Sequence, residues 1–172
     1  MTIFIDHLNL ERESDPGYWY IWAADFKNTF IYLFTSEQKL LKRKRINIDR
    51  LPPQPGHLSM WIIYFSAIEL YLKTFLIKEG DCDIETLRTK YGHRLKELLQ
   101  ECKNVSKLRI PNEFENRELN EIIEILQKMT KTDDWTVIRY PGKSLGMLGR
   151  DSVIKPLLFL EERVKSLVWV KD

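Results

Sequence analysis

Cysteine and histidine are scarce in this sequence of 172 residues, which limits the chemistry that it can support. There are two cysteines, Cys82 and Cys102, and three histidines, His7, His57 and His93. None of them shows the close spacing of zinc ligands, so we expect no metal site. Two isolated cysteines in a chain of this length are typical of a reduced, intracellular protein.

The sequence also lacks the glycine patterns of the common nucleotide-binding loops. Gly142-Lys143-Ser144 resembles the end of a phosphate-binding loop, but Val137 occupies the position of the first glycine. The late glycines are too widely spaced for a dinucleotide-binding fingerprint. We therefore expect no bound cofactor.

Neither a strong net charge nor a long uncharged apolar run is present. The formal charge of +2 is too small to argue for nucleic-acid binding by itself. Glu69 and Lys73 interrupt the most apolar stretch, residues 58–79, so we expect no membrane span. Residues 1–15 have no basic start followed by an apolar core, and the expected location is the cytoplasm.

What the sequence does contain is helical periodicity over most of its length. We predict one all-α domain over residues 1–172, an up-and-down bundle of about five main helices. The central helix is residues 58–79, followed by one or two turns at 84–90 and by helices around 95–102 and 119–129. The last helix begins between Asp151 and Pro156 and carries Leu158 inward with its other apolar residues.

Residues 1–50 add an arm and an aromatic helix before this bundle. Asp15 and Pro16 predict the helix start, and the periodic pattern ends near Ser36. Apolar residues spaced by three and four predict its inner face: Trp19, Trp22, Ala23, Phe26, Phe30 and Leu33. These rings fill the core in one interpretation and form a platform for a small ligand in another.

Two loops and one charged segment complete the predicted organisation. Residues 51–56 are rich in proline and predict an extended connection, while residues 130–149 predict a loop with a β-prone strip at 135–142. Five positive charges lie within seven residues, at Lys39 and at 42–45. They form either a solvated surface or a contact for phosphates.

The most informative feature is a carboxylate in the middle of the apolar stripe of the central helix. Glu69 falls among Leu58, Ile62, Phe65, Leu72 and Leu76, where an unpaired charge would be unfavourable. Lys73 follows one turn later, at the spacing that favours an ion pair. Gly92-His93 opens the next long helix, and Arg139-Tyr140 lies in the β-prone strip.

Three sequence pieces together resemble the HEPN-like helical domains of prokaryotes. They are the helix end around Glu69 and Lys73, the segment Tyr91-Gly92-His93 with the leucines after it, and Ile138-Arg139-Tyr140-Pro141. The resemblance covers roughly residues 57–170. It implies a helical bundle that forms homodimers, acts with RNA or nucleotides, and is paired with a nucleotidyltransferase-type protein in a toxin–antitoxin or defence system.

The resemblance does not extend to the motif of the active ribonucleases. Those members carry an arginine followed four to six residues later by a histidine on a late helix, whereas this sequence has no histidine after His93. Arg88 and His93 have the required spacing, but in the segment that precedes a helix. We therefore treat Arg88, His93 and Arg139 as candidate catalytic residues and a non-catalytic interaction or dimerisation module as the alternative.

We predict that Glu69, Lys73, His93 and Arg139, with the neighbouring Tyr140, converge in one partly buried cluster. In a structural interpretation, the cluster fastens the loops to the central helix and satisfies its own charges. In a functional interpretation it binds phosphate or RNA, with His93 as acid or base and Arg139 or Lys73 as an electrostatic clamp.

Overall fold

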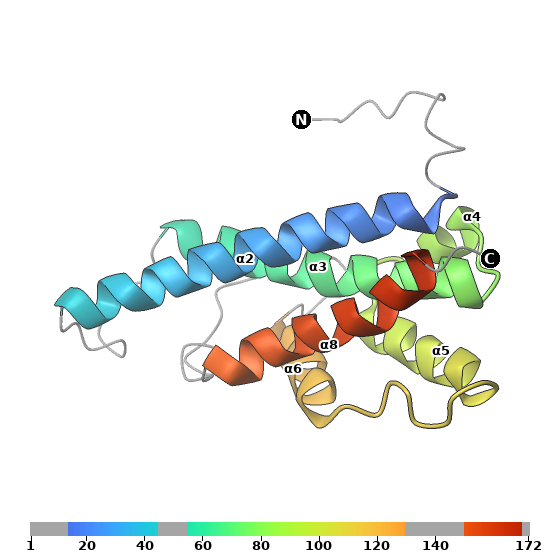
Figure 1. The fold of residues 1–172 in the computed structure, drawn as a ribbon. Helices are drawn as coiled ribbons and strands as arrows, with labels where there is room; N and C mark the ends of the chain where they lie inside the picture. The colour runs from blue at the N-terminus through green and yellow to red at the C-terminus, as the bar shows by residue number, and fades with distance from the viewer. Residues whose placement is uncertain (1–13, 45–54, 130–149, 170–172) are drawn as a thin grey trace.

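The computed structural model describes residues 14–44, 55–129 and 150–169 (Figure 1). Within these ranges the chain is helical and contains no strand, so the all-α prediction is confirmed. The helical elements are α2 (Pro16–Lys44), α3 (Pro55–Glu79), α4 (Ile84–Thr86), the π-helical turn η3 (Leu87–Tyr91), α5 (Leu95–Lys107), α6 (Arg117–Met129) and α8 (Arg150–Trp169).

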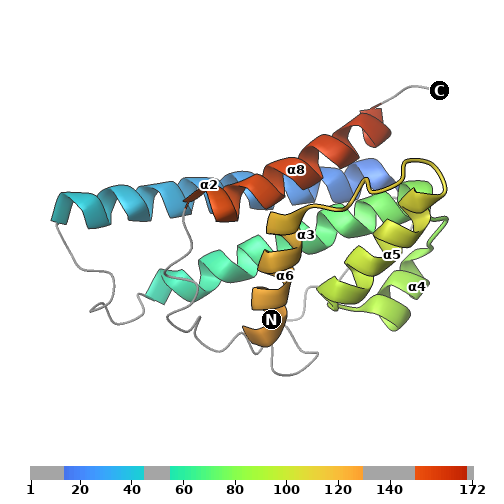
Figure 2. The same cartoon turned by 90° about the horizontal axis from the view of Figure 1, so that it is seen from below.

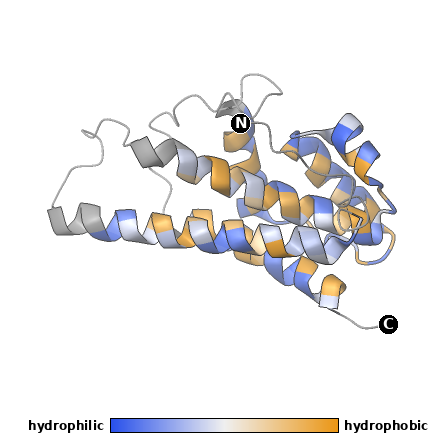
Figure 3. Ribbon diagram, turned by 90° about the horizontal axis from the view of Figure 1, so that it is seen from above, coloured by the Kyte–Doolittle hydropathy of each residue, from blue (hydrophilic) through white to orange (hydrophobic). Residues whose placement is uncertain are grey.

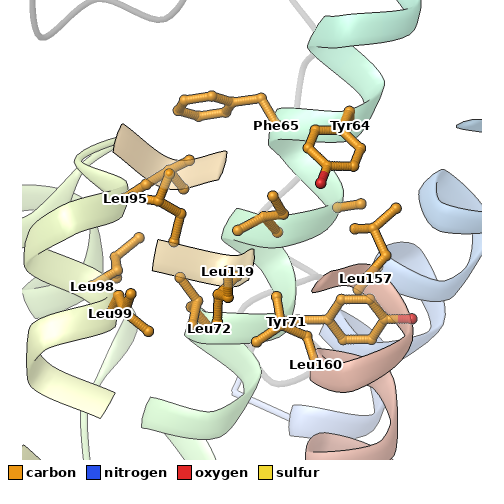
Figure 4. Close-up of a cluster of buried hydrophobic side chains, with 14 of the residues drawn as sticks. Tyr64, Phe65, Tyr71, Leu72, Leu95, Leu98, Leu99, Leu119, Leu157 and Leu160 are labelled. Carbon is orange, nitrogen blue, oxygen red and sulfur yellow. The ribbon is translucent and has the colours of Figure 1, made fainter. Parts of the chain in front are cut away.

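Helix α3 is the centre of the molecule, as the sequence predicts. It contacts α2, α5 and α8, and every residue from Tyr71 to Leu76 is buried. A helix that is apolar on most sides requires neighbours on most sides. Figure 4 shows leucines of α5, α6 and α8 meeting the α3 side chains in one core. Each large apolar side chain buried there contributes roughly 1.5–3 kcal/mol.

The long helices α2, α3 and α8 run alongside one another, whereas α6 lies across them (Figure 2). Helix α2 runs antiparallel to α3, but α3 and α8 run in the same direction (Figure 1), so the described helices do not form a simple up-and-down bundle. The segment between α5 and α6 is anchored by Phe114, which is fully buried and packs edge-on against Phe75 with 4.6 Å between the ring centres. An anchor of this kind fixes where α6 begins and how it crosses the core.

Helix α2 is longer than predicted and buries a different face. Asp15 caps it by accepting a hydrogen bond from the Gly17 backbone N–H at 2.8 Å, as expected. The helix then continues past Ser36 to Lys44, because residues 37–44 are mostly good helix formers and contain no glycine or proline. The basic segment from Lys39 to Lys44 is thus helical.

The buried residues of α2 are Tyr20, Ala23, Lys27, Phe30 and Phe34. The predicted inner face was wrong at Trp22 and Leu33, which are 46% and 37% exposed. The inner face was predicted from apolar residues alone, so Lys27 was left out of it. Without Lys27, the predicted face is turned about the helix axis by a fraction of a turn from the observed one. Figure 3 shows the resulting mixture of apolar and polar residues along α2.

Three smaller predictions also differ from the structure. Helix α3 begins at Pro55, inside the predicted extended loop, because proline is favoured in the first helical turn. Leu158 of α8 is 46% exposed rather than inward-facing. Helix α5 extends to Lys107, beyond the predicted end of its apolar stripe. The predicted strip at residues 135–142 lies outside the described residues.

One described helix, Ser59–Glu79, is long and apolar enough by composition to cross a membrane. Its apolar window is 72% buried inside the bundle, as expected for the core helix of a globular protein. Length and composition alone do not separate these two possibilities, so the absence of a membrane span stays a prediction.

Candidate functional site

The candidate site is built on Glu69, whose carboxylate lies at the predicted position inside the bundle. Its side chain is only 9% exposed. An isolated carboxylate there would lose its hydration without compensation, so partners must satisfy both oxygens. The structure supplies a cation to one oxygen and an imidazole to both.

Lys73 provides the cation from the same helix. Its Nζ donates to Oε1 of Glu69 at 2.5 Å, and its side chain is 6% exposed. The pair has the four-residue spacing that brings two side chains together on one helical face. Because Lys73 is buried and bound to Glu69, it neutralises the carboxylate and does not reach the surface as a clamp for a ligand.

His93 provides the imidazole from the turn between η3 and α5. Its Nδ1 lies 2.9 Å from Oε2 and 3.1 Å from Oε1 of Glu69. An ionised carboxylate can only accept hydrogen bonds, so the Nδ1–H of His93 is the donor. The His93 side chain is 41% exposed, and the cluster thus joins a buried acid to a histidine at the surface.

A glycine and an unusual helical turn place His93 opposite Glu69. The η3 turn closes with a 2.9 Å hydrogen bond from the Gly92 N–H to the Leu87 carbonyl, the wide spacing of a π-helix. Gly92 has φ 52° and ψ −119°, a combination that residues with a side chain strongly disfavour. This single residue lets the chain reverse sharply and direct the next side chain back toward α3.

Arg94 stabilises the same turn from the other side. Its Nε donates to the Tyr91 carbonyl at 3.3 Å, and its terminal Nη2 donates to the Lys90 carbonyl. These carbonyls belong to the end of η3, where helical carbonyls lack partners within the helix. Arg94 therefore fixes the turn and not a ligand.

The N-terminal helix also contributes to the cluster, through Trp19. The Lys73 Nζ lies 5.9 Å from the centre of the Trp19 ring, within the range of a cation–π contact. Four side chains from α2, α3 and the η3–α5 turn thus form a continuous chain of contacts: Trp19, Lys73, Glu69 and His93. The sequence placed Trp19 in the core but gave no indication of its contact with Lys73.

The structure thus brings together three of the predicted site residues, Glu69, Lys73 and His93. Arg88 is exposed on η3, five residues before His93. Arg139 and Tyr140 lie outside the described residues, so their part in the cluster stays a prediction. The sequence did not identify Asp83 as the cap of α4. Its carboxylate accepts a hydrogen bond from the Thr86 N–H, and hydrogen bonding with Thr86 lowers the pKa of Asp83.

No group of three or more metal-binding side chains occurs in the described parts of the chain. Cys82 and Cys102 are both free thiols, and Cys102 is fully buried, which raises its pKa well above the usual value. A buried protonated thiol is unreactive. The chemistry available at the site is therefore that of an imidazole held by a carboxylate.

No protein-family model matches the chain, and no curated protein or solved structure matches it at a significant level.

Proposed function

We propose that this chain is a HEPN-like protein that acts on RNA or on nucleotide phosphates, with His93 as its acid–base group. The observation that supports the proposal is the contact between His93 and the buried Glu69. A carboxylate that accepts from one ring nitrogen fixes the tautomer and the orientation of an imidazole. Fixing both is a recurrent way to prepare a histidine for proton transfer.

The chemistry follows from the two ring nitrogens. With Nδ1 donating to Glu69, the neutral ring has Nε2 as its proton acceptor. That nitrogen would remove the proton from a ribose 2′-hydroxyl, whose oxygen attacks the neighbouring phosphorus to form a 2′,3′-cyclic phosphate. The 5′-oxygen of the next nucleotide is displaced and leaves as a hydroxyl after taking a proton from water. Glu69 would stabilise the imidazolium formed in this step, and Arg88, exposed five residues before His93, is the candidate cation for the phosphate.

The second candidate is a non-catalytic interaction module, in which the cluster only fastens the η3–α5 turn to α3. Apolar side chains on the outer surface favour it: Ile21 and Tyr32 of α2 are 52% and 72% exposed, and Trp169 of α8 is 59% exposed. Such residues are enriched where proteins associate. A homodimer, or a complex with a nucleotidyltransferase-type partner, would cover this surface.

The His93→Asn variant separates the two candidates. The asparagine amide can replace Nδ1–H as the donor to Glu69 but cannot transfer protons near neutral pH. We expect RNA cleavage to fall by about 100- to 10,000-fold, the usual contribution of an acid–base group, with the melting temperature nearly unchanged. Cleavage of a labelled RNA pool and thermal unfolding would be measured on the same samples.

Lys96→Ala is the matched control, because Lys96 lies three residues later in the first turn of α5 and pairs with Glu124 at the surface. Its cleavage rate should equal that of the wild type. If the wild type cleaves no RNA, or if His93→Asn cleaves as fast as the wild type, the catalytic proposal is wrong. If His93→Ala loses stability and the wild type has no activity to lose, the structural role of His93 is the one that remains.

A further inference from the structure

The flank of α2 that contains Trp19 carries a row of aromatic rings at the surface. Tyr18, Trp22 and Phe26 are spaced by four residues, with Trp22 6.2 Å from Tyr18 and 6.1 Å from Phe26 between ring centres. Trp22 is 46% exposed, and the other two are partly buried. These three residues, with Trp19 beside them, are called the aromatic strip below.

Ring contacts between α2 and α3 show which part of α3 the strip lies beside. Phe30 is 4.5 Å from Tyr64, Tyr20 is 6.0 Å from Tyr71, and Trp19 contacts Lys73. The two helices are therefore antiparallel, so a step forward on α2 matches a step back on α3. Trp22, three residues after Trp19, lies level with Leu70, three residues before Lys73 and next to Glu69.

The side of α3 below the strip is partly open to solvent. Most residues of α3 from Met60 to Leu76 are buried, but Ile62, Ser66 and Leu70, together with Ile63, are only partly buried. Helical spacing places Ile62, Ser66 and Leu70 on the same side of α3 as Lys73, the residue that contacts Trp19. The aromatic strip, this side of α3 and the half-exposed His93 thus border one another.

Two exposed cations precede His93 in the chain. Arg88 and Lys90 are both exposed on η3, the turn that leads directly into His93. Lys73 contacts the Trp19 ring from below but is buried and bound to Glu69, so the exposed cations are those of η3. Exposed aromatic rings beside cations are the combination that single-stranded nucleic acids require, since bases stack on the rings and phosphates bind the cations.

We propose that the aromatic strip of α2 stacks the bases of a single-stranded RNA and so delivers its backbone to His93. This inference rests on the proposed function and adds the part that holds the substrate. In this proposal helix α2 binds the substrate as well as packing against the core. A second copy of the chain is the competing occupant, but lysines and a titratable imidazole are unusual at the centre of such an interface.

The test compares two exposed aromatic residues on α2. Trp22→Ala removes the central ring of the strip, and Tyr32→Ala removes a more exposed ring outside it. Binding would be followed by fluorescence anisotropy with a labelled oligoadenylate of about twelve nucleotides, a length within the usual range of single-strand sites. An abasic strand of the same length, at the same salt concentration, tests whether the bases are needed.

We expect Trp22→Ala to weaken oligoadenylate binding by roughly ten- to a hundredfold, in line with the loss of one stacked base. Tyr32→Ala should bind as the wild type does, and Trp22→Phe should recover most of the lost affinity. The abasic strand should bind equally to the wild type and to Trp22→Ala. Melting temperatures and helical circular dichroism would establish that each variant is folded.

Three results would overturn the inference. If Trp22→Ala binds as well as the wild type while His93→Asn still loses cleavage, the aromatic strip does not bind the bases, and the proposed function stands. A wild type that binds neither strand rejects the proposed function, and the inference with it. A dimeric wild type that becomes monomeric in Trp22→Ala, measured by sedimentation, assigns the strip to a second copy of the chain.

Discussion

At the scale of single residues, the central feature is a buried carboxylate with two partners of different kinds. Lys73 neutralises Glu69 within one helix, and His93 connects it to a turn 24 residues away. A buried ion pair seldom adds net stability compared with apolar residues of similar size, because both charges lose their hydration. Its presence here is therefore better explained by the orientation of His93 than by stability.

This explanation predicts an asymmetry between single and double substitutions. Lys73→Met leaves the Glu69 carboxylate buried without its cation, so the free energy of unfolding should fall by about 3–5 kcal/mol. Glu69→Leu combined with Lys73→Met removes both charges and should recover most of that loss. Urea unfolding curves of the wild type and these two variants measure the difference.

If the double variant were as unstable as Lys73→Met, the pair would be a source of stability in itself. The double variant should also lose RNA cleavage, because nothing then holds the Nδ1 of His93. Recovery of stability without recovery of cleavage is the pattern expected of a positioning pair.

At the scale of elements, the geometry of the site depends on how η3 ends and α5 begins. Gly92 closes η3 and then takes a backbone conformation that other residues disfavour. An added Cβ would meet only the Arg88 carbonyl, at 3.6 Å, so backbone strain and not a clash opposes substitution. The turn is short, and its shape sets the position of His93.

Gly92→Ala should therefore lower the free energy of unfolding by about 1–3 kcal/mol, the usual range for a residue forced into a sparsely populated conformation. It should also shift His93 away from Glu69 and slow RNA cleavage. Chemical denaturation and single-turnover cleavage measure the two effects. Lys96→Ala, at the start of α5, is the control and should change neither. A Gly92→Ala variant with wild-type stability and activity would show that the turn does not need this conformation.

The packing of α2 also explains why the sequence left its aromatic residues open to two interpretations, core or ligand platform. The periodicity of α2 identified its helical character correctly, but apolar residues also lie beside the inner face, and the inner face itself contains a lysine. Lys27 is 7% exposed and pairs with Glu161 of α8 at 2.5 Å. No local pattern connects residues 134 positions apart, so the sequence could not show that this lysine faces inward.

At the scale of the whole molecule, two polar contacts between described residues help to hold α2 to the rest of the bundle. Trp19 contacts Lys73 of α3, and Lys27 pairs with Glu161 of α8. Burial raises the pKa of the Tyr71 hydroxyl well above its usual value, and the charge of Glu161 raises it further. That hydroxyl has no hydrogen-bond partner among the described residues, so it lies in a largely apolar setting beside the second contact.

The sequence predicted the parts of this molecule that depend on local pattern. Helical class, the central position of α3 and the cap at Asp15 follow from spacing and from residue preference. The meeting of Glu69, Lys73 and His93 also followed, because a charge in an apolar stripe must find partners. The crossing of α6 and the rotation of α2 depend on packing between distant segments, which a single sequence does not encode in any short pattern.

A neutralised, buried Glu69 holds the Nδ1–H of His93 in this structure, and histidine nitrogen NMR reports on that contact without relying on any activity. Long-range proton–nitrogen correlation spectra distinguish the two neutral tautomers, and His93→Asn identifies the His93 signals by their loss. We predict that the Nδ1–H form dominates in the wild type and that Glu69→Leu restores the Nε2–H form. An Nε2–H tautomer in the wild type, unchanged by Glu69→Leu, would show that Glu69 does not hold the imidazole.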